Sequence, residues 1–259
     1  MNNIAIHAML QSKAMEQAGD AHITRVLMGI NWTVVELGWG DGSCSQGLCF
    51  SPVAIPRHIP WAGSLRGRHA SELAGWLTMD DSASVTVGIA TCNAILNGPH
   101  NSLLQSATEL LMPGQPHLAV FSHFAPQLAG KKVAIIGRYP QLDSFREQFS
   151  FDCIEKRPGP GDHPEEAAGT LLPEADWVFI TASALANGTL ARLLQWSANA
   201  TTVLMGPTLP CVAEWRNFGV DYLAPVQVHA PGLLFDIVAE AGGTLIFGNA
   251  VGYRVLPLA

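Results

Sequence analysis

The chain has 259 residues, of which 48% are hydrophobic and only 14% are charged, against about 25% charged in a typical soluble domain. Its net charge of −7 excludes a protein that binds phosphate backbones through a basic surface, and the composition also excludes a coiled coil and a charge-rich disordered chain. This length predicts one large or two modest domains, and the absence of 18 consecutive apolar residues predicts no membrane span.

The first part of the chain is typical of an α+β domain, with strands followed by helices. Two apolar, β-branched runs flank Gly29-Ile30-Asn31, which predicts a β-hairpin. The elements expected here are a helix at 3–18, strands at 25–30, 32–37 and 48–53, and helices at 64–78 and 84–96.

Beyond a Pro- and Gly-rich stretch near residue 115, apolar strands alternate with helices. Such alternation indicates a parallel sheet that is covered on both faces. We therefore predict a domain at 1–115 followed by a doubly wound, Rossmann-like α/β domain at 116–259. Its expected strands are 132–136, 151–155, 177–181, 201–205 and 220–223, and its expected helices are 141–149, 164–169, 189–196, 212–218 and 233–241.

A glycine-rich segment, Gly38-Trp39-Gly40-Asp41-Gly42, follows the second strand and is similar to the cofactor loop of S-adenosylmethionine-dependent methyltransferases. Such a loop needs a helix immediately after the glycines, so that the helix N-terminus holds the ligand. A strand-like run follows instead, and the favoured interpretation is a hairpin loop.

Polar loops follow four of the expected parallel strands, where ligands of open α/β sheets bind. Gly137 permits close approach of a ligand, Tyr139 could stack on a ring, and Glu155 could accept ribose hydroxyls or be an ordinary surface carboxylate. The loop after 177–181 carries hydroxyls and a side-chain amide, which could bind a ligand or cap the following helix. The loop after 201–205 is stiffened by proline. The candidate ligand-binding residues at this edge are Gly137, Tyr139, Glu155, Thr181, Ser183, Asn187, Thr189, Gly206 and Thr208.

The helix at 84–96 carries Asn93, and Asn97 follows one turn later on the same face. A buried asparagine needs hydrogen-bond partners. These two side chains therefore either satisfy loop carbonyl groups or face the ligand, and both alternatives stay open.

The cysteines number five and form no Cys-x-x-Cys pair. This pattern predicts reduced thiols in a cytoplasmic protein. His-x-x-x-His and His-Glu-x-x-His motifs are absent, and His117 and His123 make only a weak metal-site candidate. No metal ligand is therefore predicted, and no cofactor is identified.

The order of several motifs resembles the heavy-metal chelation family. They are the Ala-Thr-x-Asn-Ala-x-x-Asn run within 84–97, Val-x-x-Ile-Gly-x-Tyr-Pro at 133–140, Asp-x-Val-x-Ile-Thr-x-Ser with the following Asn-Gly-Thr at 176–189, and 206–210. The resemblance implies an enolase N-terminal-like domain before the Rossmann-like domain and a small-molecule site between them. It also implies a link to chelator-, pterin- or siderophore-like compounds.

These observations together predict a protein that binds a chelator-like metabolite between its two domains, and the resemblance implies that it acts on this metabolite as an enzyme. The alternatives are a non-catalytic metal or ligand carrier and an S-adenosylmethionine-dependent methyltransferase. Expected partners are a small-molecule ligand and a second copy of the chain, without nucleic acid or membrane. Residues 84–130 contain one charged residue, Glu109, so we expect this stretch to be buried between domains or subunits.

Overall fold

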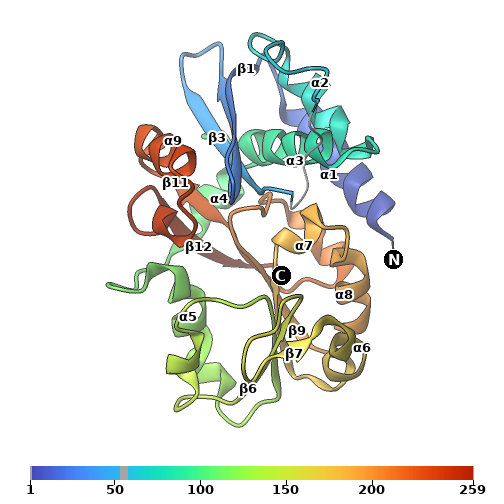
Figure 1. Ribbon diagram of the computed structural model, residues 1–259, viewed down its shortest axis with the longest axis vertical. Helices are drawn as coiled ribbons and strands as arrows, with labels where there is room; N and C mark the ends of the chain where they lie inside the picture. The colour runs from blue at the N-terminus through green and yellow to red at the C-terminus, as the bar shows by residue number, and fades with distance from the viewer. Residues whose placement is uncertain (1, 53–57, 259) are drawn as a thin grey trace.

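The computed structural model describes residues 2–52 and 58–258 and contains two β-sheets (Figure 1). The smaller sheet is antiparallel, with the order β1-β2-β3. Its strands are β1 (His22–Met28), β2 (Trp32–Gly38) and β3 (Cys44–Phe50). The predicted hairpin is confirmed, and its β1–β2 turn lies at 29–31.

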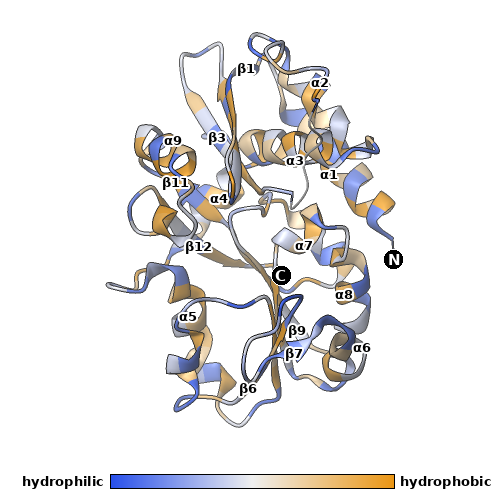
Figure 2. Ribbon diagram, in the orientation of Figure 1, coloured by the Kyte–Doolittle hydropathy of each residue, from blue (hydrophilic) through white to orange (hydrophobic). Residues whose placement is uncertain are grey.

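Helix α3 (Ser82–Leu96) packs against one face of this sheet and is buried almost throughout. The α3 part of the low-charge stretch is therefore buried inside the chain, whereas Leu111, later in the same stretch, is exposed. Figure 2 shows apolar residues along α3. Helices α1 (Asn3–Gln17) and α2 (Ala70–Ala74) pack on α3 in turn. Gly47 of β3 permits this close packing, since a Cβ atom there would lie 2.1 Å from the backbone of α3.

Helix α9 (Pro231–Ala239), from the end of the chain, packs against β1 and β2. The Asn31 amide donates to the Ala241 carbonyl at 2.7 Å, and the Trp32 indole donates to the Gly243 carbonyl at 3.0 Å. The small sheet thus lies between helices that are far apart in the sequence.

The larger sheet has nine strands, eight of them in the order β11-β12-β10-β9-β8-β5-β6-β7, with β4 paired to β12. Strands β5 to β10 are mutually parallel, whereas β12 is antiparallel to β10, β11 and β4. The fold is therefore mixed α/β with a parallel-strand sheet, as predicted, but antiparallel strands complete one side of the sheet. The bounds are β4 (Thr108–Glu109), β5 (Val133–Ile136), β6 (Phe151–Glu155), β7 (His163–Pro164), β8 (Trp177–Thr181), β9 (Thr201–Met205), β10 (Tyr222–Ala224), β11 (Val226–Val228) and β12 (Val251–Pro257).

Helices cover both faces of the large sheet. Phe121 and Phe124 of α5 (Ala119–Leu128) belong to the core cluster on one face. Leu190 and Leu194 of α8 (Leu190–Trp196) belong to the cluster on the other face. The remaining helices are α4 (Ser102–Ser106), α6 (Ala168–Leu171) and α7 (Ser183–Ala186), with short 3-10 turns at 75–78, 116–118, 142–145, 165–167, 172–174, 213–218 and 244–246.

Several predicted elements differ from the structure. The helix expected at 212–218 is a 3-10 turn, and the one expected at 164–169 is a 3-10 turn followed by α6. The helix expected at 141–149 is a 3-10 turn at Leu142–Phe145, preceded by Gln141 in the left-handed conformation, with φ of 61°. The helix expected at 64–78 begins only at Ala70, after Gly67 with φ of 83°. The strand expected at 48–53 ends at Phe50, and residue 53 lies outside the described residues.

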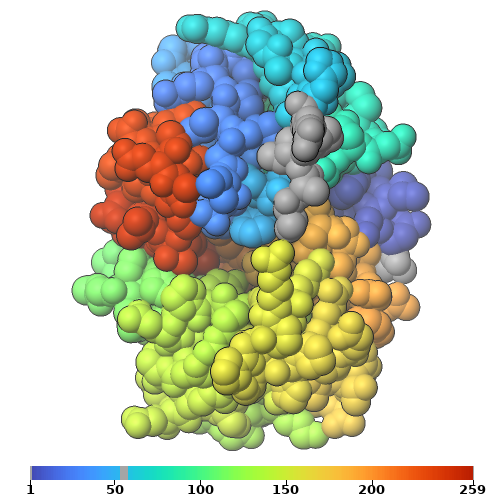
Figure 3. Space-filling view, in the orientation of Figure 1, coloured from blue at the N-terminus to red at the C-terminus, as the bar shows by residue number. Residues whose placement is uncertain are grey.

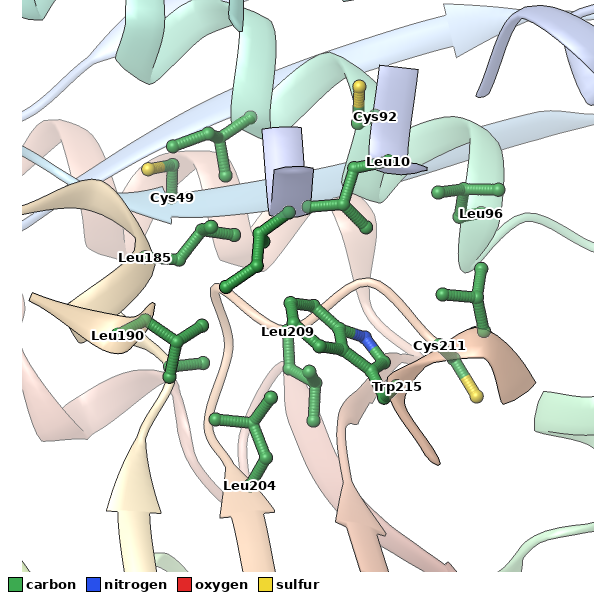
Figure 4. Packing of buried hydrophobic residues seen from close by; sticks show 14 of the residues in the cluster. Leu10, Cys49, Cys92, Leu96, Leu185, Leu190, Leu204, Leu209, Cys211 and Trp215 are labelled. Atoms are coloured by element: carbon green, nitrogen blue, oxygen red, sulfur yellow. The ribbon is translucent and has the colours of Figure 1, made fainter. Parts of the chain in front are cut away.

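The two sheets share one apolar core cluster (Figure 4). Leu10 and Leu96, from α1 and α3, lie opposite Leu209 and Trp215, which belong to the segment after β9. All four side chains are fully buried. Burying a leucine contributes roughly 1.5–3 kcal/mol, so this seam holds the two parts of the chain firmly together.

None of the helices in the described part of the chain is long and apolar enough to cross a membrane.

Candidate functional site

The candidate site lies at the carboxyl ends of the parallel strands. Strand β5 has β6 on one side and β8 on the other, so the order in which the chain adds strands to the sheet reverses at β5. Open α/β sheets bind ligands at such a point. Figure 3 shows the surface hollowed between the green and yellow atoms of the large-sheet region and the blue and red atoms above them.

Gly137 lies at this reversal, directly after β5. Its φ is 99°, and a Cβ atom would lie 3.0 Å from the methyl group of Thr181. Glycine is therefore required by both the backbone conformation and the close approach of β8. The hydroxyls of Thr181 and Ser183 lie 3.0 Å apart, so the structure brings these three predicted residues together.

Two buried tyrosine hydroxyls near this edge have no hydrogen-bond partner among the described residues. Tyr139 follows Gly137, and its hydroxyl lies near that of Thr181 but outside hydrogen-bonding geometry. Tyr253 comes from β12, which has no counterpart among the predicted elements. A charge on the Tyr139 phenol would raise the pKa of Tyr253, so the two side chains lie in the same region of the protein.

Burial raises the pKa of both tyrosine hydroxyls. Both therefore stay neutral near pH 7 and can donate a hydrogen bond. Their rings are fixed by packing: Tyr139 meets Phe121 edge-on at 5.1 Å, and Tyr253 stacks on Phe247 at 5.0 Å. The predicted role of Tyr139 in stacking on a ligand ring remains a prediction.

Glu155, at the end of β6, accepts hydrogen bonds from the backbone N–H groups of Arg138 at 2.9 Å and Arg157 at 3.3 Å. The nearby side chain of Asp162 is almost fully buried and pairs with Arg138 at 3.0 Å. The negative charges of both carboxylates are thus balanced within the chain, by backbone hydrogen bonds to Glu155 and by the ion pair of Asp162. In this structure Glu155 fixes the loop after β5.

Asn93 and Asn97 satisfy loop carbonyl groups, the first of the two alternatives. The Asn93 amide donates to the carbonyls of Leu48 at 2.8 Å and Pro207 at 2.6 Å. The Asn97 amide donates to Leu209 at 3.0 Å and to the side-chain oxygen of Asn93.

Asn101, the N-cap of α4, adds a third asparagine beyond the end of α3 and donates to the Cys211 carbonyl at 2.8 Å. The four-residue spacing of Asn93 and Asn97 is visible in the sequence and indicates a shared helix face, but it does not extend to Asn101. Together they hold the 207–211 loop against the first part of the chain, and we call these three residues the asparagine row.

Thr208 is buried, and its hydroxyl accepts from the Phe50 backbone N–H at 2.9 Å. Gly206 lies beside it with φ of 121°, close to the backbone of Ala182. The loop after β9 thus lies next to the β8 loop, but its hydroxyl is used within the chain.

Asn187 and Thr189 lie at the start of α8. The side-chain oxygen of Asn187 accepts from the backbone and hydroxyl of Thr189, at 3.1 and 2.6 Å, which closes the turn locally. Asn3 of α1 then accepts from the Ala191 backbone at 3.2 Å. The Thr189 side chain makes no capping hydrogen bond to α8, so Asn187 closes the turn before the helix and Asn3 caps the helix. A ligand-binding role for Asn187 and Thr189 stays a prediction.

The glycine-rich segment at 38–42 is a hairpin loop, as favoured. Gly38 of β2 pairs with Cys44 of β3 in antiparallel register. The Gly40 N–H donates to the Asp20 carboxylate at 3.0 Å. The segment leads directly into β3, so the helix N-terminus of a methyltransferase loop does not follow it.

The described residues contain no cluster of three or more His, Cys, Asp or Glu side chains that could hold a metal ion. His117 contacts the Pro140 carbonyl at 2.9 Å, and His123 packs edge-on against Phe124 at 4.8 Å. All five cysteines are free, as predicted, and four are buried. Burial raises the pKa of Cys153 and Cys211 to about 12, so they remain thiols, whereas metals bind thiolates.

A separate cavity of about 540 Å³ lies between the 109–116 segment and β12. Its charged groups pair with each other, because Arg254 lies 3.7 Å from Glu109. Tyr253 lines this cavity, but none of the predicted site residues does. A smaller cavity of about 130 Å³, near β3 and β11, includes Asn97 in its lining.

Comparisons with known structures identify the fold. A DUF364 family protein of unknown function from Desulfitobacterium hafniense is 24% identical, has a TM-score of 0.78 and is matched over 96% of this chain and 98% of its own. A DUF364 family protein from Pyrococcus horikoshii is 21% identical, also with a TM-score of 0.78, over 97% of this chain and 99% of its own. These likenesses show the fold alone.

Sequence comparisons give the family. An uncharacterized protein of Methanocaldococcus jannaschii is 31% identical over 128 residues, which are 46% of this chain and 49% of that protein, so the chain spans about half the length of this relative. The DUF4213 family model matches residues 11–96, and the DUF364 model matches residues 119–257; both are described as "Putative heavy-metal chelation". The predicted resemblance is confirmed: the chain belongs to the DUF364 heavy-metal chelation family.

Proposed function

We propose that this protein binds a small organic metabolite, of the chelator, pterin or siderophore type, at the carboxyl edge of the large sheet. The observation that carries the proposal is the pair of buried hydroxyls of Tyr139 and Tyr253, which lack a hydrogen-bond partner among the described residues. Leaving a buried donor unsatisfied costs roughly 1–3 kcal/mol. A bound molecule that accepts from these groups would recover this free energy.

The family description refers to heavy metals, and an organic chelator agrees with the residues better than a bare ion does. Soft metals need thiolate or clustered imidazole ligands. The buried thiols are protonated, and the described residues hold no such cluster. The protein would therefore handle a metal through its organic ligand.

Binding is better supported than a reaction. Glu155 is the acidic group nearest the strand ends, and two backbone N–H groups already occupy it. A general acid or base must reach the proton that it transfers. We therefore place recognition of the metabolite first and an enzymatic reaction on it second.

The broader organisation belongs to the same proposal. We divide the chain at residue 115 into an enolase N-terminal-like unit and a Rossmann-like unit, supported by the separate small sheet and by helices on both faces of the large one. The free thiols support a cytoplasmic location. Self-association is proposed through the exposed Leu111, whose side chain is 81% accessible.

The test is thermal-shift and calorimetric screening of the purified protein against pterins, catecholates, hydroxamates and their metal complexes. Binding of one class should weaken about tenfold in Tyr139→Phe, the loss expected for one hydrogen bond. Tyr222→Phe, which removes a phenol hydroxyl at the other end of the strands, against Trp177, is the matched control and should bind normally. Loss of binding in Tyr222→Phe but not in Tyr139→Phe would contradict a site at the carboxyl edge.

A further inference from the structure

The two unpaired tyrosine hydroxyls also define the chemistry of the ligand, if the proposed function holds. We infer that the bound molecule presents an acceptor oxygen, such as a carboxylate, carbonyl or catecholate oxygen, to the hydroxyls of Tyr139 and Tyr253. The two tyrosines would thus select the organic part of a chelate. They would not coordinate its metal.

The positions of both hydroxyls are set before a ligand arrives. Tyr253 is 1% exposed and lies against Phe247 with a 23° angle between the rings. Tyr139 lies between the end of β5 and Phe121. A tyrosine side chain has few torsions to restrict, so two packed phenols give a fixed pair of donors at little entropic cost.

The protonation state of these groups favours an acceptor over a cation. A metal ion binds phenolate, and forming it in this environment is costly because burial raises the pKa of both hydroxyls. Neutral phenols keep their protons and donate them in hydrogen bonds. This argument agrees with the observation that neither hydroxyl has an acceptor among the described residues.

The surrounding charges allow a negatively charged oxygen to approach. Glu155 accepts two backbone hydrogen bonds, and Asp162 is paired with Arg138. These two carboxylates are therefore largely compensated within the chain. An anionic acceptor oxygen would therefore approach the two phenols without charge repulsion from an unpaired carboxylate.

The composition of the chain makes a direct test practical, because it contains three tyrosines. Incorporating 3-fluorotyrosine gives one fluorine NMR signal each for Tyr139, Tyr222 and Tyr253, assigned by single Tyr→Phe substitutions. Tyr222 is the internal control, since it lies against Trp177, at the opposite end of β8 from Thr181. The probes are benzoate, 2,3-dihydroxybenzoate, acetohydroxamate, a pterin and Zn²⁺ alone.

We expect at least one organic probe to shift the signals of Tyr139 and Tyr253 but not that of Tyr222, and Zn²⁺ alone to shift none. Its affinity, measured by calorimetry, should fall about tenfold in Tyr139→Phe and in Tyr253→Phe. A shift of both signals by Zn²⁺ alone would overturn the inference. If calorimetry shows that a probe binds while both tyrosine signals stay unmoved, the inference is overturned but the proposed function is not. If no organic probe binds, the inference and the proposed function are both overturned.

Discussion

Two polar regions lie near the strand ends of the large sheet, and they differ in how their hydrogen bonds are used. In the asparagine row (Asn93, Asn97 and Asn101), side-chain amides reach carbonyls of neighbouring segments, from Leu48 to Cys211. In the tyrosine pair (Tyr139 and Tyr253), both hydroxyls lack a partner among the described residues.

The comparison shows that polar residues near a ligand-binding edge need not bind a ligand. Buried polar groups are almost always hydrogen-bonded in native proteins. The satisfied region therefore contributes to stability and holds the 207–211 loop. The unsatisfied region contributes little to stability, because its two hydroxyls have no partner among the described residues. Substitutions in the two regions should have opposite consequences.

The largest expected effect is in the asparagine row. Asn93→Ala removes the donor from two buried carbonyls and the acceptor of Asn97, and should lower the free energy of unfolding by about 3 kcal/mol. Urea unfolding measures this change. The exposed Asn249, which bonds only its own turn, is the matched control: Asn249→Ala should cost less than about 0.5 kcal/mol. Equal losses in the two variants would refute the claim that the hydrogen bonds of Asn93 stabilise the fold.

A smaller loss is expected for Thr208→Val. The substitution preserves shape but removes the hydroxyl that accepts from the Phe50 N–H. Leaving that part-buried N–H unpaired should cost about 1 kcal/mol, measured by the same urea unfolding. Unchanged stability would mean that this contact does not help to hold the 207–211 loop to β3.

Tyr253→Phe should change stability in the opposite direction. It removes a buried hydroxyl without a partner among the described residues, so the free energy of unfolding should stay constant or rise by up to about 1 kcal/mol. Measured beside Thr208→Val, this compares a buried hydroxyl that has a partner with one that does not. A loss above 1 kcal/mol would show that the Tyr253 hydroxyl is already satisfied.

The effect that is smallest at neutral pH concerns the thiols. Burial raises the pKa of Cys153 and Cys211 to about 12, from an ordinary value of 9.0. Their stabilising contribution is therefore complete below pH 9 and is lost as the pH rises from 9 towards 12. Unfolding free energies measured from pH 7 to 10.5 should be level at first and then fall.

Cys211→Ala should reduce the alkaline fall in stability, and a thiol-reactive reagent at pH 8 should label only the exposed Cys44 in the folded protein. Rapid labelling of several thiols under native conditions would contradict the buried, protonated state.

Local patterns in the sequence predicted much of the fold. Apolar runs located four of the parallel strands closely, because a strand buried on both faces is continuously apolar. Local patterns also predicted the hairpin at 29–31 and the helix that contains Asn93. Helix α5 has no counterpart among the predicted elements, and it contains Pro126, which normally breaks a helix.

The site was harder to predict, because it depends on contacts between distant segments. Spacing placed Asn93 and Asn97 on one helix face, but only the position of the 207–211 loop decides between a carbonyl and a ligand as their partner. Tyr253 was missed because β12 pairs with strands more than 20 residues earlier in the chain. No local pattern indicates that its hydroxyl is buried without a partner.

The most direct measurement is an experimental electron-density map of the protein purified without added ligand, followed by one soaked with an organic probe that binds. The account predicts non-protein density with an acceptor oxygen within about 3.2 Å of the hydroxyls of Tyr139 and Tyr253. Hydroxyls that bond to protein atoms or to ordered water in both maps, with the probe bound elsewhere, would contradict the account.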